Sequence, residues 1–393
     1  MKTAIVHEWL ITYAGSERVF GRIAGLYPEA DIFSLLDFLP ESDRDFILGR
    51  NVTTSFIQRF PMAREKYRGY LPLMPLAVKG FDLSGYDLII TSSHTAAKGV
   101  RKYPGQIHIC YCHTPMRYIW DLQNQYLKES GFDSGIRGLI LRALFSRLRK
   151  WDVSTSKNVD HFIANSNYIK GRIKKAYGRD SVVIYPPVDV ANFEVNEKKE
   201  DFFIAVSRMV PYKKMGLIVE AFSEMGLPLI VIGDGPDFGK VKRKARKNIE
   251  LMGHLKADVL KMYMQKARAL VFAAEEDFGI VPVEAQACGT PVIAFGRGGV
   301  RETVIPINNL EVESEKLELK TLNSQIATRN LSPTGIFFNE QTPSALIDAV
   351  RKFEKIEGRF NPYNLRKNAE RFSKERFDKE FSSFINEKTA GLF

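Results

Sequence analysis

The residues best suited to chemistry are two glutamates in one short block. Residues 275–291 read EEDFGIVPVEAQACGTP, which places Glu276 in an acidic turn and Glu284 further along, with seven residues between them. A strand is expected before the turn and a helix after it, and open α/β sheets bind ligands at the carboxyl ends of their strands. The two carboxylates could therefore contact two parts of one elongated ligand. The alternative is that such acidic residues only complement the positive end of the helix.

The start of the same helix predicts an anion site. The backbone N–H groups of Phe278, Gly279 and Ile280 would have no partner inside the helix. Free N–H groups and the helix dipole together favour a negatively charged ligand such as a phosphate. The block therefore combines two carboxylates with an expected site for an anion.

Two cations follow another expected strand. Arg208 comes after the strand expected over residues 202–206, and Lys213 opens the next expected helix. An arginine that binds bidentately and a lysine that acts as a point charge could together hold a diphosphate. Taken alone, such a pair is also typical of a solvated surface.

In the first half of the chain, Gly15 and His113 each follow an expected strand. Gly15 precedes a helix for which Ser16 is the expected N-cap, and a glycine there would let a phosphate or sugar approach the backbone. A plain strand-to-helix turn explains Gly15 equally well. His113 leaves its strand just before Pro115 and is followed by polar and aromatic residues. Taken alone, a histidine in this setting is more often structural than functional.

Short apolar strands alternate with helical segments, which predicts parallel sheets covered by helices on both faces. Strands are expected at residues 3–6, 31–35, 87–91, 107–112, 162–164, 182–185, 202–206, 228–232, 250–252, 269–273 and 291–294. Helices are expected at residues 168–177, 214–225, 257–267, 281–288, 344–356 and 364–387. Pro186 and Pro187, followed by a charged run, separate two doubly wound modules. The polar segment 308–332 is expected to be an insertion, which either shapes the acceptor side or decorates the surface.

The composition is that of an ordinary globular protein with an excess of positive charge. Of 393 residues, 45% are hydrophobic and 26% charged, which excludes a disordered, collagen-like or coiled-coil chain. Lys and Arg number 57 against 46 Asp and Glu, a net charge of +11. Such an excess favours a polyanionic partner, either nucleic acid or an anionic membrane.

The three cysteines cannot form a disulfide framework in a chain of this size, so a reducing compartment is expected. We expect the thiols of Cys110 and Cys112 to face opposite sides of their strand, and we expect no metal site. No segment has the pattern of a signal peptide or a membrane-spanning helix. These features predict a cytoplasmic protein, either soluble or peripheral to a membrane.

In this order, the motifs resemble those of the retaining glycosyltransferases of family four, which have the GT-B architecture. The likeness covers almost the whole chain and includes the paired glutamates and the cations Arg208 and Lys213. It also includes the runs GDGP at 233–236, GH at 253–254 and GTPVIA at 289–294. In the first half, AIVHEWL at 4–10, SSH at 92–94 and HTPMRY at 113–118 resemble the mannosyltransferase branch.

The resemblance implies a fold of two Rossmann-like doubly wound domains that face a cleft. Residues 1–190 would form the acceptor-side domain, and residues 191–373 the sugar-nucleotide-binding domain. The final helix, residues 374–393, would cross back and pack on the first domain. The first loop has the single glycine Gly15 where relatives often have two, so backbone contact with the donor is less secure there.

The resemblance also implies a role for each candidate residue. Arg208 and Lys213 would hold the donor diphosphate and Glu284 the ribose. Glu276 would contact the donor sugar, and His113 would lie near the reacting face of that sugar. The full set implied to bind the donor is Gly15, Arg208, Lys213, Gly233, His254, Phe278, Gly279, Ile280 and Glu284. The catalytic set is His113, Glu276, Arg208 and Lys213, with no metal or other cofactor, because cations and N–H groups can stabilise the leaving phosphate.

The likeness at residues 113–118 favours GDP-mannose as the donor, with a UDP-sugar as the alternative. Family habit implies a glycan or lipid-linked saccharide as the acceptor, in bacterial surface polysaccharide synthesis. A sugar-nucleotide epimerase and a non-catalytic nucleic-acid-binding protein are the competing classes. The run KVKRKARK at 240–247 favours nucleic acid but has no interleaved aromatic residues that could stack bases. We therefore expect no nucleic-acid partner.

Two segments of the first domain account for part of the positive charge. Over residues 56–79 basic and aromatic residues are interleaved, and over residues 136–151 arginines surround a helical apolar stripe that includes Leu139, Ile140 and Leu148. Basic amphipathic segments suit the surface of an anionic leaflet. Packing within the domain is the equal alternative. The pattern allows association with the inner face of the cell membrane.

Overall fold

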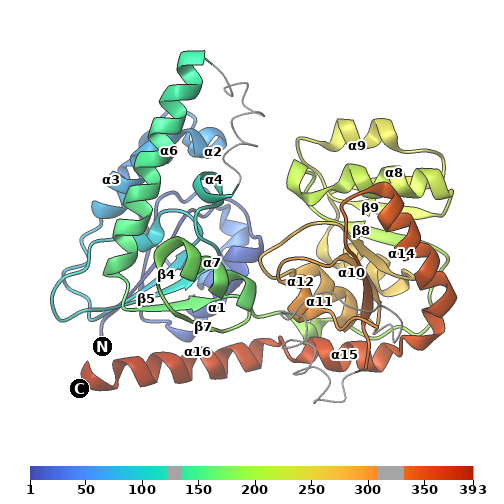
Figure 1. Ribbon diagram of the computed structural model, residues 1–393. Helices are drawn as coiled ribbons and strands as arrows, with labels where there is room; N and C mark the ends of the chain where they lie inside the picture. The colour runs from blue at the N-terminus through green and yellow to red at the C-terminus, as the bar shows by residue number, and fades with distance from the viewer. Residues whose placement is uncertain (122–134, 308–331, 393) are drawn as a thin grey trace. The chain divides into compact units, whose positions relative to one another are not determined.

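The protein is described by a computed structural model that covers residues 1–121, 135–307 and 332–392 (Figure 1). The chain divides into two compact units. The first comprises Met1–Pro187 and Glu375–Phe393, and the second comprises Val188–Lys374. Most of the segment expected to be an insertion, residues 308–331, lies outside the described residues.

The first unit is built on a parallel seven-stranded sheet in the order β3-β2-β1-β4-β5-β6-β7. Its strands are β1 (Thr3–His7), β2 (Asp31–Ser34), β3 (Val52–Thr54), β4 (Leu88–Ser93), β5 (Ile107–Cys112), β6 (His161–Ala164) and β7 (Ser181–Val183). Its helices include α1 (Gly15–Leu26), α2 (Ala63–Lys66), α3 (Met74–Lys79), α4 (Arg117–Trp120), α6 (Gly135–Thr155), α7 (Asn167–Tyr177) and α16 (Lys374–Thr389). Strands β1 and β4 are buried along their whole length, which explains why they read as unbroken apolar runs rather than alternating ones.

The second unit has a parallel six-stranded sheet in the order β10-β9-β8-β11-β12-β13. Its strands are β8 (Phe203–Val206), β9 (Leu229–Ile232), β10 (Ile249–Gly253), β11 (Leu270–Phe272), β12 (Val292–Phe295) and β13 (Gly335–Phe338). Its helices include α8 (Met215–Met225), α9 (Phe238–Lys244), α10 (Ala257–Lys266), α11 (Ile280–Ala287), α12 (Val300–Thr303), α14 (Pro343–Ile356) and α15 (Pro362–Glu370). Both units are therefore doubly wound α/β sheets, and the fold is GT-B as predicted.

In each sheet the strand order reverses at one place. The chain moves outward from β1 to β2 and then returns to β4 on the other side, and it does the same from β8 through β9 to β11. In open α/β sheets, ligands bind at such a reversal, outside the carboxyl ends of the strands. Gly15 follows β1, Lys213 follows β8 and Glu276 follows β11, so these three candidate residues lie after strands at the two reversals.

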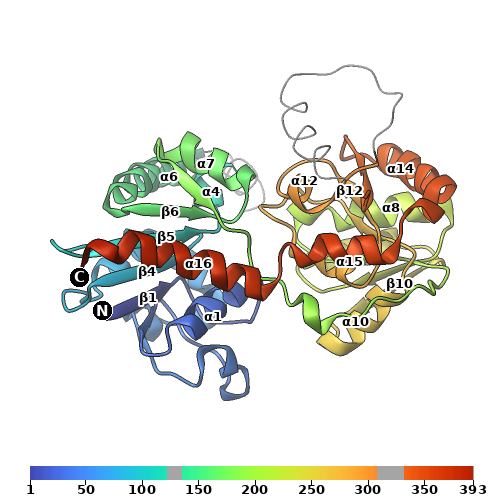
Figure 2. The ribbon, with the colours of Figure 1, turned by 90° about the horizontal axis from the view of Figure 1, so that it is seen from below.

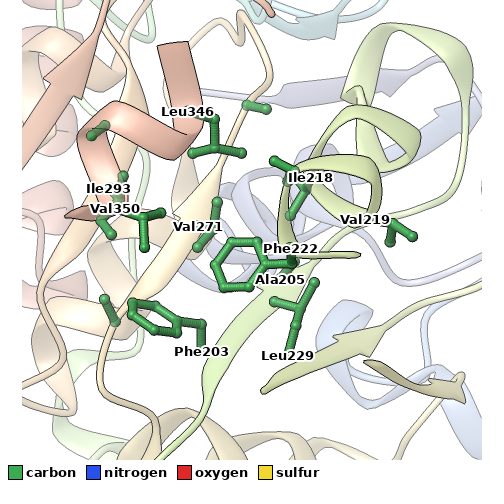
Figure 3. Packing of buried hydrophobic residues seen from close by; sticks show 14 of the residues in the cluster. Phe203, Ala205, Ile218, Val219, Phe222, Leu229, Val271, Ile293, Leu346 and Val350 are labelled. Carbon is green, nitrogen blue, oxygen red and sulfur yellow. The ribbon is translucent and has the colours of Figure 1, made fainter. Parts of the chain in front are cut away.

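The cores lie between the sheets and the helices. In the second unit, Phe222 of α8 and Leu346 and Val350 of α14 pack with Phe203 and Val271 of the sheet (Figure 3). In the first unit, α16 runs along one face of the sheet near α1 (Figure 2), and its Phe377 and Phe381 are fully buried there. The C-terminal helix is thus part of the core of the first unit.

Three details differ from the sequence expectations. Strands β3 and β13 are absent from the expected set, since β3 is a short, part-exposed edge strand and β13 follows the polar segment. The helical stretch expected over 364–387 is two helices, α15 and α16. Between them, Ser373 pairs with Val188 in a parallel bridge, and the Val188 N–H donates to the Phe372 carbonyl at 2.8 Å, so the chain is extended there.

The expectation about the cysteines is wrong. Side chains two residues apart in a strand share a face, and Cys110 and Cys112 both pack in one cluster with Phe162 and Ile169. Burial in this apolar cluster raises the pKa of the Cys112 thiol well above its ordinary value. The pair therefore behaves as core.

Candidate functional site

In the second unit, the loops after β8 and β11 bring two candidate residues into contact. The Nζ atom of Lys213 forms an ion pair with Oε1 of Glu276. Lys213 ends a single 3-10 turn, Pro211–Lys213, just before α8, and Glu276 lies in the turn between β11 and α11. The two side chains are only 16% and 21% exposed, so solvent screens this pair less than a surface pair. The sheet thus places a cation and a carboxylate side by side at the carboxyl ends of neighbouring strands.

The loop after β12 forms backbone contacts with the turn that contains Glu276. The Gly299 N–H donates to the Glu276 carbonyl oxygen at 2.8 Å, and Glu276 and Gly298 form a parallel bridge. At Gly298 the φ angle is +79°, and an added Cβ would lie 2.3 Å from the Glu276 carbonyl oxygen. Only glycine fits this approach. The run GRGG at 296–299 follows an apolar strand, a signal that could have marked this loop from the sequence.

The loops after β8, β9 and β10 are joined by backbone hydrogen bonds. The Gly233 N–H donates to the Gly253 carbonyl at 2.7 Å, and the Met209 N–H donates to the Asp234 carbonyl at 2.8 Å. A Cβ at Gly233 would lie 1.9 Å from the Ser207 carbonyl oxygen, so the close approach of Gly233 to Ser207 also requires glycine. The candidate residues Arg208 and His254 lie in these joined loops with exposed side chains.

Helix α11 carries the remaining candidates of the second unit. It begins at Ile280, and Gly279 is its N-cap residue. Phe278 is buried, and its ring packs edge-to-face on Phe372 with 5.4 Å between centroids. Glu284 lies within the helix and is only 6% exposed. Its carboxylate is therefore not part of the exposed polar surface of the second unit.

In the first unit, Gly15 is the exposed first residue of α1. The expected N-cap, Ser16, is wrong, because the helix is capped by Ala14 and Ser16 lies inside its first turn. The N–H of Ala14 donates instead to Oε2 of Glu17 at 3.2 Å, and the Ser16 hydroxyl donates to the same oxygen at 3.0 Å. Glu17 therefore makes the half of a capping box in which the carboxylate of the third helical residue accepts from the N-cap N–H.

His113 is buried directly after β5. Its Nε2 lies 2.8 Å from the Ser92 hydroxyl oxygen, its backbone N–H donates to the Ser93 carbonyl at 2.8 Å, and its carbonyl accepts from the Asn165 amide at 3.0 Å. Burial, with further contributions from the nearby histidines His94 and His7, lowers the pKa of His113 well below its usual value. The ring is therefore neutral near pH 7 and has one donor and one acceptor nitrogen.

The loop after β4 is fixed by a carboxylate that the sequence reasoning did not single out. Glu8 is fully buried and accepts hydrogen bonds from the Ser93 hydroxyl and from consecutive backbone N–H groups of residues 94–97. Burial alone would raise the pKa of Glu8, but the charge of His94 and the N–H donors outweigh it and hold the pKa below its usual range. The sequence signal that could have marked Glu8 is the polar pair His7-Glu8 at the end of an apolar strand.

The basic run at 240–247 is part of α9 and its C-terminal turn. Val241 is buried, Lys244 pairs with Glu220, and the Arg246 side chain donates to the Ser223 carbonyl at 3.2 Å. Lys240 pairs with Asp237 one turn away. Several of these charges are engaged within their own unit, as expected of a solvated helix face.

Helix α6 only partly matches the expected apolar stripe. Leu148 is 3% exposed and packs with Ile119 of α4, whereas Leu139 and Ile140 are 66% and 63% exposed. The alternative of packing within the domain therefore holds for the middle of α6, whereas Leu139 and Ile140 nearer its start are exposed. The side chains of Ile136 and Arg137 lie outside the described residues. Within the described ranges, no helix is both long and apolar enough to cross a membrane.

Two protein families match the chain, one in each half. Residues 26–192 match the family described as Glycosyltransferase Family 4, and residues 189–376 match Glycosyl transferases group 1. The two matches meet at the joint between the units.

Among curated proteins, an uncharacterized glycosyltransferase of Methanocaldococcus jannaschii is 32% identical over 199 residues, which is 47% of this chain and 56% of that protein. The O-antigen chain mannosyltransferase RfbU of Salmonella typhimurium is 30% identical over 167 residues, 39% of this chain and 46% of that protein. The chain thus spans about half the length of the curated relatives it matches.

Two solved structures share the fold over nearly the whole chain. Sucrose-phosphate synthase from Thermosynechococcus elongatus has a TM-score of 0.72 at 17% identity and covers 100% of both chains. The Anabaena protein HepE in complex with UDP has a TM-score of 0.68 at 17% identity and covers 98% of this chain and 100% of its own. At such identities the likeness concerns the fold.

Proposed function

We propose that this chain, whose two halves match Glycosyltransferase Family 4 and Glycosyl transferases group 1 and whose fold is GT-B, transfers a hexose from a nucleotide-sugar donor to a saccharide acceptor, with retention at the anomeric carbon. The observation that carries this proposal is the contact between Lys213 and Glu276 beside the start of α11. A cation, a carboxylate and a helix N-terminus at one sheet edge suit a ligand that combines a diphosphate with sugar hydroxyls.

In this mechanism the second unit stabilises the leaving nucleoside diphosphate. Negative charge grows on the β-phosphate as the bond to the anomeric carbon breaks. Lys213, Arg208 and the N–H groups at the start of α11 provide fixed positive charge for it, so the proposed reaction needs no metal. The diphosphate competes with Glu276 for Lys213, and this competition couples the position of the sugar-binding carboxylate to occupation of the phosphate site.

Glu276 positions the donor sugar in this proposal and does not attack it. The resemblance assigns His113 of the first unit to the reacting face of the sugar, and Glu284 to the ribose hydroxyls. The discriminating experiment is a search for a glycosyl ester on Glu276 by mass spectrometry after incubation with donor. A trapped ester would replace the positioning role with a nucleophilic one.

For the donor we propose GDP-mannose, with a UDP-sugar as the alternative. Support for mannose comes from the names of relatives, which include the Salmonella mannosyltransferase and a GDP-mannose-dependent mannosyltransferase of Corynebacterium glutamicum that is 30% identical over 194 residues. The structural neighbour HepE was solved with UDP, which keeps the alternative open. By the same reasoning we propose a glycan or lipid-linked saccharide acceptor in bacterial surface polysaccharide synthesis.

A thermal-shift panel of GDP- and UDP-sugars tests the donor. A ligand present at about 100 times its dissociation constant adds roughly 2.7 kcal/mol to the stability of the folded state. Release of free nucleoside diphosphate together with a new glycan product then separates a transferase from a sugar-nucleotide epimerase and from a binding protein. If no sugar nucleotide shifts the unfolding temperature, the proposed function is wrong.

We further propose that the first unit binds an anionic membrane surface through the start of α6. Leu139 and Ile140 are well exposed there, and Arg142 and Arg147 follow on the same helix with exposed side chains. Exposed apolar side chains flanked by cations bind anionic lipid, at about 1 kcal/mol per basic residue near the surface.

A further inference from the structure

Four polar side chains of the first unit form a chain from the start of α1 to His113. His7 Nε2 lies 3.6 Å from Oε1 of Glu17, and His7 Nδ1 lies 3.1 Å from the Ser92 hydroxyl oxygen. That hydroxyl oxygen lies 2.8 Å from His113 Nε2. His7 and Ser92 are completely buried, and Glu17 and His113 are nearly so. The four groups come from α1, β1, β4 and the end of β5, so the parallel sheet lines them up.

Glu17 uses its two carboxylate oxygens differently. Oε2 accepts from the Ala14 N–H and the Ser16 hydroxyl and so caps α1, whereas Oε1 faces His7. Capping alone does not require a histidine at the second oxygen. Burial would raise the pKa of Glu17, but the contact with His7 outweighs burial and holds the pKa below its usual value. Glu17 is therefore a carboxylate and accepts hydrogen bonds only.

The ionised carboxylate sets the direction of every hydrogen bond that follows. The His7 nitrogen that faces it, Nε2, must carry a hydrogen, because a lone pair there would repel the carboxylate. The tautomer proposed below requires a neutral His7 ring. In that ring Nδ1 is then an acceptor, and the Ser92 hydroxyl donates to it. Because the Ser92 hydroxyl donates its hydrogen to His7, its oxygen can only accept a hydrogen bond from His113. Nε2 of His113 must therefore carry a hydrogen.

We propose that Glu17, His7 and Ser92 are positioning residues that hold His113 in the tautomer with hydrogen on Nε2, and so leave Nδ1 of His113 as an acceptor for a substrate hydroxyl. The part that concerns substrate rests on the proposed function. The orientation of the second nitrogen of a histidine by the partner of the first is a general device in sites that handle protons.

Among the described residues, several aromatic rings pack against the two histidines. The His7 ring stacks on Phe20 at 4.6 Å, and the His113 ring lies 5.2 Å from Tyr111. His94 contacts both histidines edge-on at 6.2 Å. One competing acceptor exists, since the Ser92 carbonyl lies 3.2 Å from His7 Nδ1. In the opposite tautomer of His7, the Ser92 carbonyl would accept a hydrogen bond from Nδ1. One change at Glu17 can therefore reverse the direction of the hydrogen bonds between His7, Ser92 and His113.

The variant Glu17→Gln makes that change. The amide oxygen takes the capping position of Oε2, because the Ala14 N–H and the Ser16 hydroxyl both donate there. The amide NH₂ then faces His7 and donates to Nε2. His7 must carry its hydrogen on Nδ1, which leaves the Ser92 hydroxyl free to donate to His113 Nε2. We expect His113 to switch to the tautomer with hydrogen on Nδ1.

The test is proton–nitrogen NMR correlation on protein labelled with ¹⁵N-histidine, which distinguishes the tautomers of the six histidines without any substrate. A neighbouring pair offers a matched control. Thr91 precedes Ser92 on β4, and its hydroxyl oxygen lies 3.0 Å from Nε2 of the buried His108. Thr91→Val removes an equivalent bond to a histidine and should change the His108 signals while His113 keeps its tautomer.

Ser92→Ala breaks the chain in the middle. We expect His113 to lose its single tautomer and Ser92→Thr, which restores the hydroxyl, to recover it. In the transferase assay both Glu17→Gln and Ser92→Ala should lower kcat by about 10²-fold, with the KM for the donor nearly unchanged. Intact folding of each variant is checked by tryptophan fluorescence.

The outcomes separate two failures. If His113 keeps hydrogen on Nε2 in a folded Glu17→Gln variant, the proposed relay is wrong, whatever the activity. If the tautomer switches but the wild-type protein releases no nucleoside diphosphate from any donor, the relay stands and the proposed function is wrong. Hydrogen on Nδ1 of His113 in the wild-type protein would also overturn the relay.

Discussion

Lys213 and Glu276 form an ion pair although they are 63 positions apart in the chain. The contact exists because β8 and β11 are neighbours in the sheet, so the loops that leave their carboxyl ends meet. Each residue fixes the other, and both lie at an edge where a ligand of mixed charge would bind. The proposed roles of both residues can be tested separately.

Replacing Lys213 by alanine should lower turnover at saturating donor by roughly 10²-fold, the typical loss when one group that stabilises developing negative charge is removed. The positive charge of Lys213 stabilises the leaving group more strongly as negative charge grows on it. Removing that charge therefore lowers kcat as well as donor affinity. The measurement is the rate of nucleoside diphosphate release. Lys240→Ala, an exposed lysine of the same unit paired with Asp237, is the control. An unchanged kcat would limit Lys213 to binding.

Glu284→Ala should weaken donor binding about tenfold to a hundredfold, since hydrogen bonds to a charged group contribute roughly 1.5–3 kcal/mol. Isothermal titration calorimetry with the donor, or with the nucleoside diphosphate alone, measures the change. Glu250→Ala removes an exposed carboxylate from β10 of the same unit and should leave the affinity as it was. Equal affinity of the Glu284→Ala and wild-type proteins would disprove the ribose role.

Gly298→Ala should disturb the turn of Glu276, because the added Cβ would lie 2.3 Å from the Glu276 carbonyl oxygen. We expect donor affinity to fall about tenfold or more, which is about 1.4 kcal/mol. Gly226→Ala has a similar φ of +74° with nothing within 4 Å, so it carries the backbone strain without the clash. The prediction fails if both variants bind donor equally well.

The stability of the first unit should fall as the pH drops from about 6.5 to 4. Burial lowers the pKa of His108 to about 4, and the pKa values of His94 and His113 are shifted in the same direction. The unfolded chain binds protons at these sites before the folded one does, so the stability is present above the unfolded pKa and is lost as the pH falls. His108 alone accounts for roughly 3 kcal/mol over this range, at 1.36 kcal/mol per pKa unit.

Urea unfolding at pH 7 and pH 5 checks this prediction. Trp9, Trp120 and Trp151 are the only tryptophans of the sequence and all lie in the first unit, so fluorescence reports on that unit alone. His108→Gln should reduce the pH dependence. Equal urea midpoints at pH 7 and pH 5 would contradict the prediction that the buried histidines make the stability depend on pH.

The proposed membrane surface predicts that the protein sediments with vesicles of phosphatidylserine and phosphatidylcholine at low salt, and not with phosphatidylcholine alone. The double variant Leu139→Ser with Ile140→Ser should lose this binding. Val259→Ser with Met262→Ser removes an exposed apolar pair from α10 of the second unit and serves as the control. If wild-type protein fails to sediment with the anionic vesicles, the surface has another role.

The sequence pattern predicted most of the strands because a doubly wound sheet buries both of its faces and so leaves unbroken apolar runs. It missed β3, whose three residues lie at an exposed edge, and it extended one helix across the Ser373 bridge. Such long-range pairing leaves no local signal.

The candidate residues of the second unit were found because they stand at the ends of apolar strands. The contacts between them could not be predicted. Neither the ion pair of Lys213 nor the approach of Gly298 to Glu276 has a fixed spacing in the sequence. Glu8 and Glu17 escaped for a similar reason. Their partners are backbone N–H groups and a histidine on other elements, which only the folded sheet brings near.

The burial of α16 in the first unit has a consequence for biosynthesis. Phe377, Phe381 and Ile385 complete the apolar face of a sheet whose first strand is formed by Thr3–His7. During translation that face of the first unit therefore stays uncovered until α16 has left the ribosome. The second unit, whose chain is contiguous, can finish first. Nascent chains that stall near residue 374 should consequently depend on chaperones that shield exposed apolar surface.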